Sequence, residues 1–508
     1  MQHLNFMGID IGGGGLKTMI VSGDGSVRGS ASVDLQTRTP FPGWSEQDPA
    51  DWWLALCDTV PRALADAGLR SDQIAAVAFS AGAHTPVLED ADGKVIRPAI
   101  LWSDGRSGAE AAQLQAEHGD EILALACNRP AATWTQPQLL WLSRHEPEVL
   151  QKARRLYVAK DWLRSRLTGT WETDATEAVG TLLYDGRRNA WSERLCAMIG
   201  LDMSVLPPIV KPTDIVGTVL PEAARACGLA VGTPVVCGSS DTSVEAFGAG
   251  ATTTGAGTVK LATAAAISVV AMGPRPSPTV INYPYCVPGH WYTIGATNSC
   301  ASAHRWLRDT FFADAGSSAA AAFDRMDEDA VAVSPGAKGL LFHPYLQGER
   351  TPHWDPLLRA DFVGMTFAHD RRHFVRALYE GIAFSLRDVL GALREHRLDL
   401  DQATIIGGGS RSAAWRQIVS DVLGVSIVMP RVTDASFGAA LIAAIGVGAF
   451  PDEATAAAQT VSIVARHDPN PAHRTLYEDL HGIYRDAAHQ LVDVNHRLAK
   501  NLSVNKIQ

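Results

Sequence analysis

The chain of 508 residues lacks the features of a membrane or secreted protein. Its most apolar stretch, residues 261–272, is about a dozen residues long and too short to cross a bilayer as a helix. The first residues, Met1 to Asn5, contain no basic segment and no long apolar run, so we expect no signal peptide. These absences predict a cytoplasmic protein without a membrane partner.

Cysteine is scarce and scattered. The chain has 7 cysteines, and no two of them have the close spacing of a zinc or redox motif. We therefore expect reduced thiols in the core of a cytosolic protein, without disulfide bonds.

Positive charge is in short supply. Lys and Arg number 44 against 54 Asp and Glu, a net charge of −10, which argues against a nucleic acid partner. The hydrophobic fraction of 46% and the charged fraction of 19% are ordinary for a folded protein, so global disorder is excluded. A phosphorylated ligand would have to be bound by local groups such as backbone N–H groups, a metal ion or a few cations.

Glycine is concentrated in an opening hairpin. Residues 4–11 and 16–21 are strand-like, and four successive glycines at 12–15 connect them. Asp10 at the end of the first strand could hold hydrated Mg²⁺ while the turn amides face a phosphate. A tight hairpin with a surface aspartate remains the alternative. The segment is not a P-loop, because it lacks Gly-Lys-Ser/Thr at the start of a helix.

A second hairpin repeats this pattern in the other half of the chain. Residues 258–261 and 267–270 flank a turn of small residues at 262–265, so two similar halves meet near residue 250. Asp241 follows a buried strand at 233–238 and could act as a catalytic base or cap the next helix. Strands that alternate with helices predict an α/β fold.

Three further features come directly after strands, where sites form in α/β proteins. Gly407 to Gly409 follow residues 404–406 and precede a helix capped by Ser410 or Ser412, so a nucleotide could approach the backbone there. His84 and Trp102 could line a pocket or could be ordinary packed side chains.

Together these features resemble the superfamily of sugar kinases, Hsp70 and actin. Residues 360–365, read ADFVGM, are followed after seven residues by HFVRALYE at 373–380, which is similar to the C-terminal signature of the FGGY carbohydrate kinases. Segments at 42–49, 100–106, 344–352 and 407–412 resemble the xylulokinase-like branch of that family. The resemblance implies an α/β fold of two RNase H-like domains around an interdomain cleft.

The resemblance also implies a division of the chain. We expect an N-terminal sugar-binding domain at 1–252, a nucleotide-binding domain at 253–450 and an extension at 451–508. Apolar residues between Leu476 and Leu498 recur at helical spacing. They predict an amphipathic helix that packs near the domain boundary through this apolar face.

The family implies roles for particular residues, with ATP and Mg²⁺ as cofactors. Asp241 would accept the proton of the sugar hydroxyl, and Asp10 would hold Mg²⁺. The sugar pocket would contain Ala83, His84, Trp102, Asp241 and Thr242. The nucleotide would lie against Gly12, Gly13, Gly14, Gly15, Lys17, Ala262, Thr263, Ala264, Gly407, Gly408, Gly409 and Ser412.

The predicted activity is ATP-dependent phosphorylation of a sugar hydroxyl, with a ketopentose such as xylulose as substrate. Residues 80–85, the sugar loop, correspond to a segment that lines the sugar site in the xylulokinase-like branch. Here Gly82 and Ala83 stand where that branch has Gln and Met, and Thr242, outside the loop, stands where the branch has Asn. These changes favour another ketose, a polyol or a sugar acid, unless Trp44 or Trp134 fills the freed space. A non-catalytic nucleotide-dependent sugar sensor and a homodimer are also left open.

Overall fold

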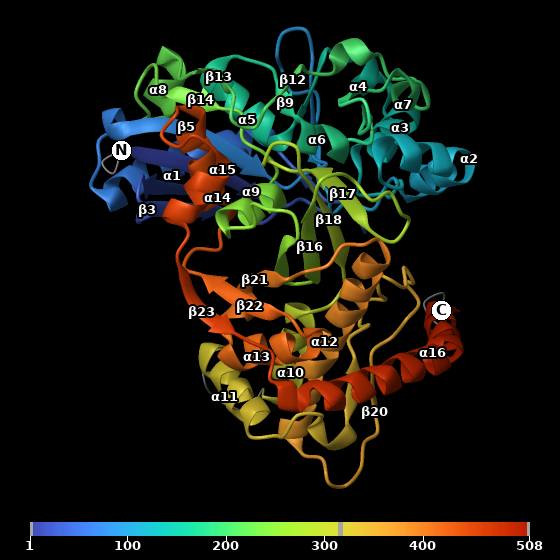
Figure 1. Ribbon diagram of the computed structural model, residues 1–508. Coiled ribbons are helices and arrows are strands. Elements are labelled where there is room, and N and C mark those ends of the chain that lie inside the picture. The colour runs from blue at the N-terminus through green and yellow to red at the C-terminus, as the bar shows by residue number, and fades with distance from the viewer. Residues whose placement is uncertain (1–3, 313–318, 505–508) are drawn as a thin grey trace.

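The computed structural model describes residues 4–312 and 319–504, which form two α/β domains, one above the other in Figure 1. The first domain is built on a six-stranded sheet with the order β13 (Ile215–Thr218), β14 (Pro234–Val236), β5 (Ile74–Ala81), β1 (Asn5–Gly12), β2 (Gly15–Ser22) and β3 (Val27–Asp34). The second is built on a seven-stranded sheet with the order β17 (Ile281–Pro284), β18 (Trp291–Ala296), β16 (Ala265–Ala271), β15 (Ala256–Leu261), β21 (Gln402–Ile406), β22 (Ser426–Pro430) and β23 (Ile463–His467).

Both sheets share one arrangement of five strands. In the first, β3, β2 and β1 are antiparallel, and β5 and β14 continue parallel to β1. In the second, β18, β16 and β15 are antiparallel, and β21 and β22 continue parallel to β15. The echo between the two hairpins is therefore a repeated fold, and the predicted α/β class with two similar domains is confirmed.

Helices cover the sheets, and short strand pairs join the loops. Those before residue 250 are α1 (Pro49–Ala67), α2 (Gly108–Ala126), α3 (Thr135–His145), α4 (Pro147–Lys152), α5 (Ala159–Thr168), α6 (Ala175–Gly180), α7 (Glu193–Ala197), α8 (Pro221–Cys227) and α9 (Asp241–Gly248). Those after it are α10 (Ala301–Phe311), α11 (Ala319–Val331), α12 (Arg371–Glu395), α13 (Ala413–Leu423), α14 (Ala435–Gly446), α15 (Glu453–Thr460) and α16 (Arg474–Val504). The short pairs are β4 (Glu46–Gln47) with β7 (Ala99–Ile100), β6 (Pro86–Glu89) with β8 (Arg155–Val158), β9 (Thr173–Asp174) with β12 (Ile209–Val210), β10 (Tyr184–Asp185) with β11 (Ala190–Trp191), and β19 (Leu341–His343) with β20 (Asp361–Val363).

Helix α14 crosses from the second half of the chain to the first domain, where it packs on β1, β5 and α9 (Figure 1). The approach is close, since a Cβ on Gly8 would lie 1.8 Å from the Ser436 carbonyl oxygen and one on Gly438 would lie 1.9 Å from that of Val244. Nearly every side chain of α14 is apolar and buried, so the helix needs cover on all sides. The segment 253–450 therefore does not form one continuous domain, because its last helix belongs spatially to the first.

Helix α16 is present as predicted, but its packed face overlaps the predicted apolar face only in part, for example at Leu480. Ile483 and Leu498 from the predicted apolar face are 55% and 53% exposed, whereas Tyr477 and Tyr484 are fully buried. The buried face bonds to the second domain, for example through Tyr477 and the Glu380 carboxylate at 2.9 Å. Hydrogen bonds by aromatic and polar side chains, which a hydrophobic periodicity ignores, thus decide its orientation.

The position of α16 agrees only in part with the expected one. The helix lies along the second domain against α13 and β19 (Figure 1). Near its end, His496 bonds to Asp355 at 2.6 Å, and the neighbouring Trp354 stacks on Arg129 of the first domain at 3.6 Å. Only the last turns therefore approach the domain boundary.

All seven cysteines carry free thiols, and six are buried. Burial raises the pKa of the partly buried Cys57 to about 11, so its thiol stays protonated and unreactive at neutral pH. Within 4–312 and 319–504, no helix combines the length and the hydropathy that a membrane span requires.

Candidate active site

The two predicted aspartates lie close enough for the charge of Asp241 to act on Asp10. Asp10 is near the end of β1, and its carboxylate accepts a hydrogen bond from the Ser80 hydroxyl at 2.7 Å. Asp241 is the first residue of α9, and its Oδ1 accepts bonds from the Thr242 backbone N–H at 2.5 Å and hydroxyl at 3.1 Å. Burial and, next, the Asp241 charge raise the pKa of Asp10 to about 8. Without a bound cation, the Asp10 carboxyl group is therefore mostly protonated at neutral pH.

The first glycine turn is exposed beside these carboxylates. Gly13 and Gly14 form the tip of the β1–β2 hairpin, where Gly12 pairs with Gly15. A Cβ on Gly14 would meet nothing within 4 Å, whereas one on Gly15 would lie 2.8 Å from the Val33 carbonyl oxygen. The tip therefore offers open backbone on a hairpin that packing holds in place.

Two lysines form ion pairs with carboxylates that were not predicted from the sequence. Lys17 on β2 contacts Asp434, the N-cap of α14, at 2.5 Å. Lys260 on β15 contacts Glu245 on α9, also at 2.5 Å. The capping pattern Asp434-Ala435-Ser436 was a readable signal for the start of a helix. No sequence pattern indicated its pairing with Lys17, or the pairing of Lys260 with Glu245.

The carboxylates suit a magnesium ion that completes its shell from water and phosphate. Among the described residues, no three His, Cys, Asp or Glu side chains are arranged to hold a metal ion alone. Mg²⁺ is commonly bound by one or two carboxylates together with waters and substrate phosphates. Asp10 supplies such a hard oxygen donor, and the charges of Asp241, Asp434 and Glu245 around it are those a divalent cation would offset.

The sugar loop is packed around His84. Burial lowers the pKa of His84 to about 4, so the ring is neutral at pH 7. Its Nδ1–H donates to the Thr133 carbonyl at 3.1 Å, so Nε2 accepts from the Tyr283 hydroxyl at 2.7 Å. Trp134 stacks on the ring with centroids 4.1 Å apart, and Ala83 just before it is half-buried. Both ring nitrogens of His84 thus have protein partners, which hold the ring in place.

Trp102 occupies the space that the small loop residues leave. A Cβ on Gly82 would lie 3.2 Å from Trp102 Cδ1 and 4.0 Å from Asp241 Oδ2. Trp102 is 48% exposed, so its ring is partly open to solvent. Trp44 packs elsewhere, with the Arg106 guanidinium 3.7 Å from its ring centroid. The indole of Trp102 therefore lies directly against Gly82, where a longer side chain would meet it.

The second hairpin turn is tied to the start of α10. The carbonyl groups of Ala262 and Thr263 accept backbone bonds from Ala301 and Cys300 at 2.8 Å and 3.0 Å. Thr263 is exposed, and Ala264 is half-buried. These contacts fix the turn on the side of the second domain that faces the glycines at the end of β21.

The triple glycine lies against this turn because β21 pairs in parallel with β15. Gly407 has a φ of +86°, and a Cβ on it would lie 2.7 Å from the Leu261 carbonyl oxygen. Gly408 is exposed, with open space where a Cβ would be. Ser412 caps α13 by accepting from the Trp415 N–H at 2.9 Å, as predicted for one of the two serines. Its hydroxyl donates to Asp327 at 2.7 Å.

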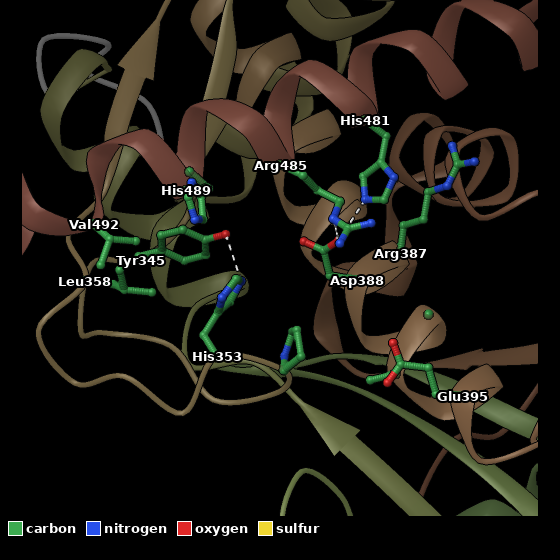
Figure 2. Close-up of a pocket in the computed structure, with 14 residues that line it drawn as sticks. Tyr345, His353, Leu358, Arg387, Asp388, Glu395, His481, Arg485, His489 and Val492 are labelled. Carbon is green, nitrogen blue, oxygen red and sulfur yellow. Dashed lines mark hydrogen bonds and ion pairs between the residues drawn. The ribbon is translucent and has the colours of Figure 1, made fainter.

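A separate cavity of about 280 Å³ lies between α12 and α16 (Figure 2). Asp388 lies at one end, where His481 contacts it at 2.9 Å and Arg485 at 3.8 Å. Leu358 and Val492 line the other end (Figure 2). None of the predicted site residues lines this cavity, which belongs to the seam between α16 and the second domain.

The repeated fold, with acidic residues beside its first glycine hairpin, is typical of a two-domain kinase of the superfamily that the sequence resembles. The N-terminal domain of the FGGY family of carbohydrate kinases matches residues 5–248, and the C-terminal domain of that family matches residues 255–447. The chain therefore belongs to the FGGY family of carbohydrate kinases.

Individual relatives agree with this assignment. A xylulose kinase of Bacillus subtilis (strain 168) is 31% identical over 492 residues, which cover 96% of this chain and 97% of the relative. A gluconokinase of the same strain is 29% identical and covers 91% of each chain. The crystal structure of xylulose kinase from Rhodospirillum rubrum matches with a TM-score of 0.90 at 29% identity over 97% of this chain and 100% of that one. The predicted family, fold class and sugar kinase activity are confirmed, while the roles of single residues stay predictions.

Proposed function

We propose that this protein transfers the γ-phosphoryl group of ATP to a hydroxyl group of a ketopentose, with xylulose as the substrate. The observation that carries the proposal is the proximity of Asp10 to Asp241, whose charge acts on Asp10 beside the first glycine turn. Full-length similarity to proteins named xylulose kinase supports the choice of sugar. The contact of Trp102 with Gly82 supports it as well, because it removes the extra volume that would favour a bulkier substrate.

The proposed reaction is direct transfer between two aligned substrates. The sugar hydroxyl oxygen forms a bond to the γ-phosphorus, and the bond from that phosphorus to the oxygen bridging to the β-phosphate breaks. The Asp241 carboxylate accepts the hydroxyl proton, and ADP leaves with the electron pair of the broken bond. Thr242 orients Asp241 through its two hydrogen bonds to Oδ1.

The remaining predicted residues bind the nucleotide in this proposal. Backbone at Gly12 to Gly15 and at Ala262 to Ala264 cradles the phosphates from the two domains, and Lys17 adds positive charge. The exposed Gly408 leaves room for the adenosine. Mg²⁺ held by Asp10 would screen the phosphate charge.

A coupled ADP-release assay over D-xylulose, other ketoses, polyols and aldonates tests the proposal. D-xylulose is expected to lead in kcat/KM by tenfold or more. A lead by gluconate or a polyol would instead identify a different sugar kinase of the same family. ATP binding by calorimetry without ADP release on any sugar would point to a sensor.

A further inference from the structure

The contact between Lys260 and Glu245 joins the two domains inside the cleft. Lys260 is on β15 of the second domain, two residues before the turn that begins at Ala262. Glu245 is on α9 of the first domain, four residues after Asp241 and so on the same helix face. The Lys260 Nζ and the Glu245 Oε2 are 2.5 Å apart. An ion pair that bridges two domains at this point borders the predicted path of the phosphoryl group.

The surroundings of Lys260 are strongly acidic. Burial lowers the pKa of Lys260, but Glu245 and, more weakly, Asp241 and Asp10 outweigh it and raise that pKa above its ordinary value, so the ammonium group is charged at neutral pH. Lys17, the other lysine of the cleft, is engaged by Asp434. Bound ATP would add further negative charge beside these carboxyl groups. A cation that contacts the γ-phosphoryl group would offset that charge and stabilise the transition state.

The side chain of Lys260 is also partly exposed. It is 31% exposed, whereas that of Glu245 is 10% exposed, so Lys260 is the more accessible partner of the pair. An ammonium group has three N–H donors, and one contact with Glu245 leaves others for a ligand. A partly exposed lysine beside Asp241 and Asp10 is therefore placed where a negatively charged ligand could contact it.

We propose that Lys260, held by Glu245, contacts the γ-phosphoryl group of ATP and stabilises it during transfer to the sugar. This rests on the proposed function, since it assumes that ATP lies in this cleft with its γ-phosphoryl group near Asp241. It adds to the glycine hairpins a cation from the second domain that is in place only when the two domains face each other. Domain closure would thereby be coupled to the chemical step.

The test compares Lys260→Met, Lys260→Arg, Glu245→Gln and the double variant Glu245→Gln/Lys260→Met. Lys260→Met is expected to lower kcat by roughly 10²- to 10³-fold, as for the loss of one preorganised donor. Lys260→Arg, which keeps the positive charge, is expected to recover most of that loss. The double variant removes the unpaired Glu245 charge, and it is expected to stay as slow as Lys260→Met.

A second arm needs no sugar. Lys260→Met should bind β,γ-imido-ATP at least tenfold more weakly than wild type, while ADP affinity stays within threefold. Lys152→Met, a surface change on α4, serves as the control. Recovery of kcat in the double variant, or equal losses for ADP and the ATP analogue, would overturn the proposal and leave the pair as a structural tie. A wild type that prefers another sugar would refute xylulose as substrate without affecting this result.

Discussion

Asp241 is the residue on which the proposed chemistry depends most directly. Asp241→Asn keeps the size of the side chain but removes the proton acceptor, so turnover should fall about 10²- to 10⁴-fold. ATP affinity and melting temperature should stay close to wild type, since within the described part of the chain the side chain of Asp241 hydrogen-bonds only to its neighbour Thr242. Turnover within a few-fold of wild type would show that Asp241 serves as a helix-terminal residue and not as the base.

His84 makes the stability of the protein sensitive to acid. The folded protein holds the pKa of His84 at about 4 because of burial, whereas the unfolded chain has the ordinary value of about 6.5. The unfolded state therefore binds more protons between these values, and the free energy of unfolding falls as the pH falls through this window. Between pH 7 and pH 5 the loss from this one ring is about 2 kcal/mol.

Urea unfolding of wild type and His84→Asn at pH 7 and pH 5 measures this effect. Asn tolerates the left-handed backbone at this position, where φ is 70°, so the variant should fold. Wild type should lose more stability on acidification than the variant. Equal losses would mean that His84 is not buried as a neutral ring.

At the scale of elements, two neighbouring glycines in the turn after β21 are expected to have different roles, one in nucleotide binding and one in folding. Gly408 has open space around its Cβ position, whereas Gly407 has a positive φ and lies against the Leu261 carbonyl. Gly408→Leu should therefore fold normally and raise the KM for ATP about tenfold or more, because its side chain fills the space proposed for adenosine. Gly407→Ala should instead lower the melting temperature.

Gly482→Leu is the matched control for this comparison. Gly482 lies on α16 and also has open space around its Cβ position. Its substitution should leave the KM for ATP unchanged. If Gly408→Leu raised the KM values for ATP and sugar equally, the strand-to-helix turn would have been disturbed as a whole.

At the scale of the whole molecule, α14 ties the C-terminal part of the chain to the first sheet. Gly8→Ala would drive a methyl group into the backbone at Ser436, which no side-chain rotation can relieve. We expect a loss of at least about 3 kcal/mol in the free energy of unfolding, or no soluble protein. Denaturant unfolding measures it, with Gly108→Ala, at a glycine with open space on α2, as the neutral control. A neutral Gly8→Ala would contradict the packing of α14 on β1.

Much of the fold and part of the site follow from local sequence. The glycine hairpin at 12–15, the turn of small residues at 262–264, the strand before Gly407 and the cap at Ser412 all depend on neighbouring residues, whose conformational preferences act over a few positions. The family signature at 360–380 placed these pieces in one architecture. These features could be predicted because each is determined by the conformational preferences of residues within a short stretch of chain.

The remaining features were decided by tertiary structure. Lys17 meets Asp434 across 417 positions of sequence, and Lys260 meets Glu245 only because two domains face each other. Trp102 takes the space at Gly82 through a long-range contact that neither segment reveals alone. The orientation of α16 follows hydrogen bonds to the second domain, against its apolar periodicity. Local sequence thus determined the hairpins and caps, while charge pairing and pocket shape required the folded chain, since both depend on groups that only folding brings within contact distance.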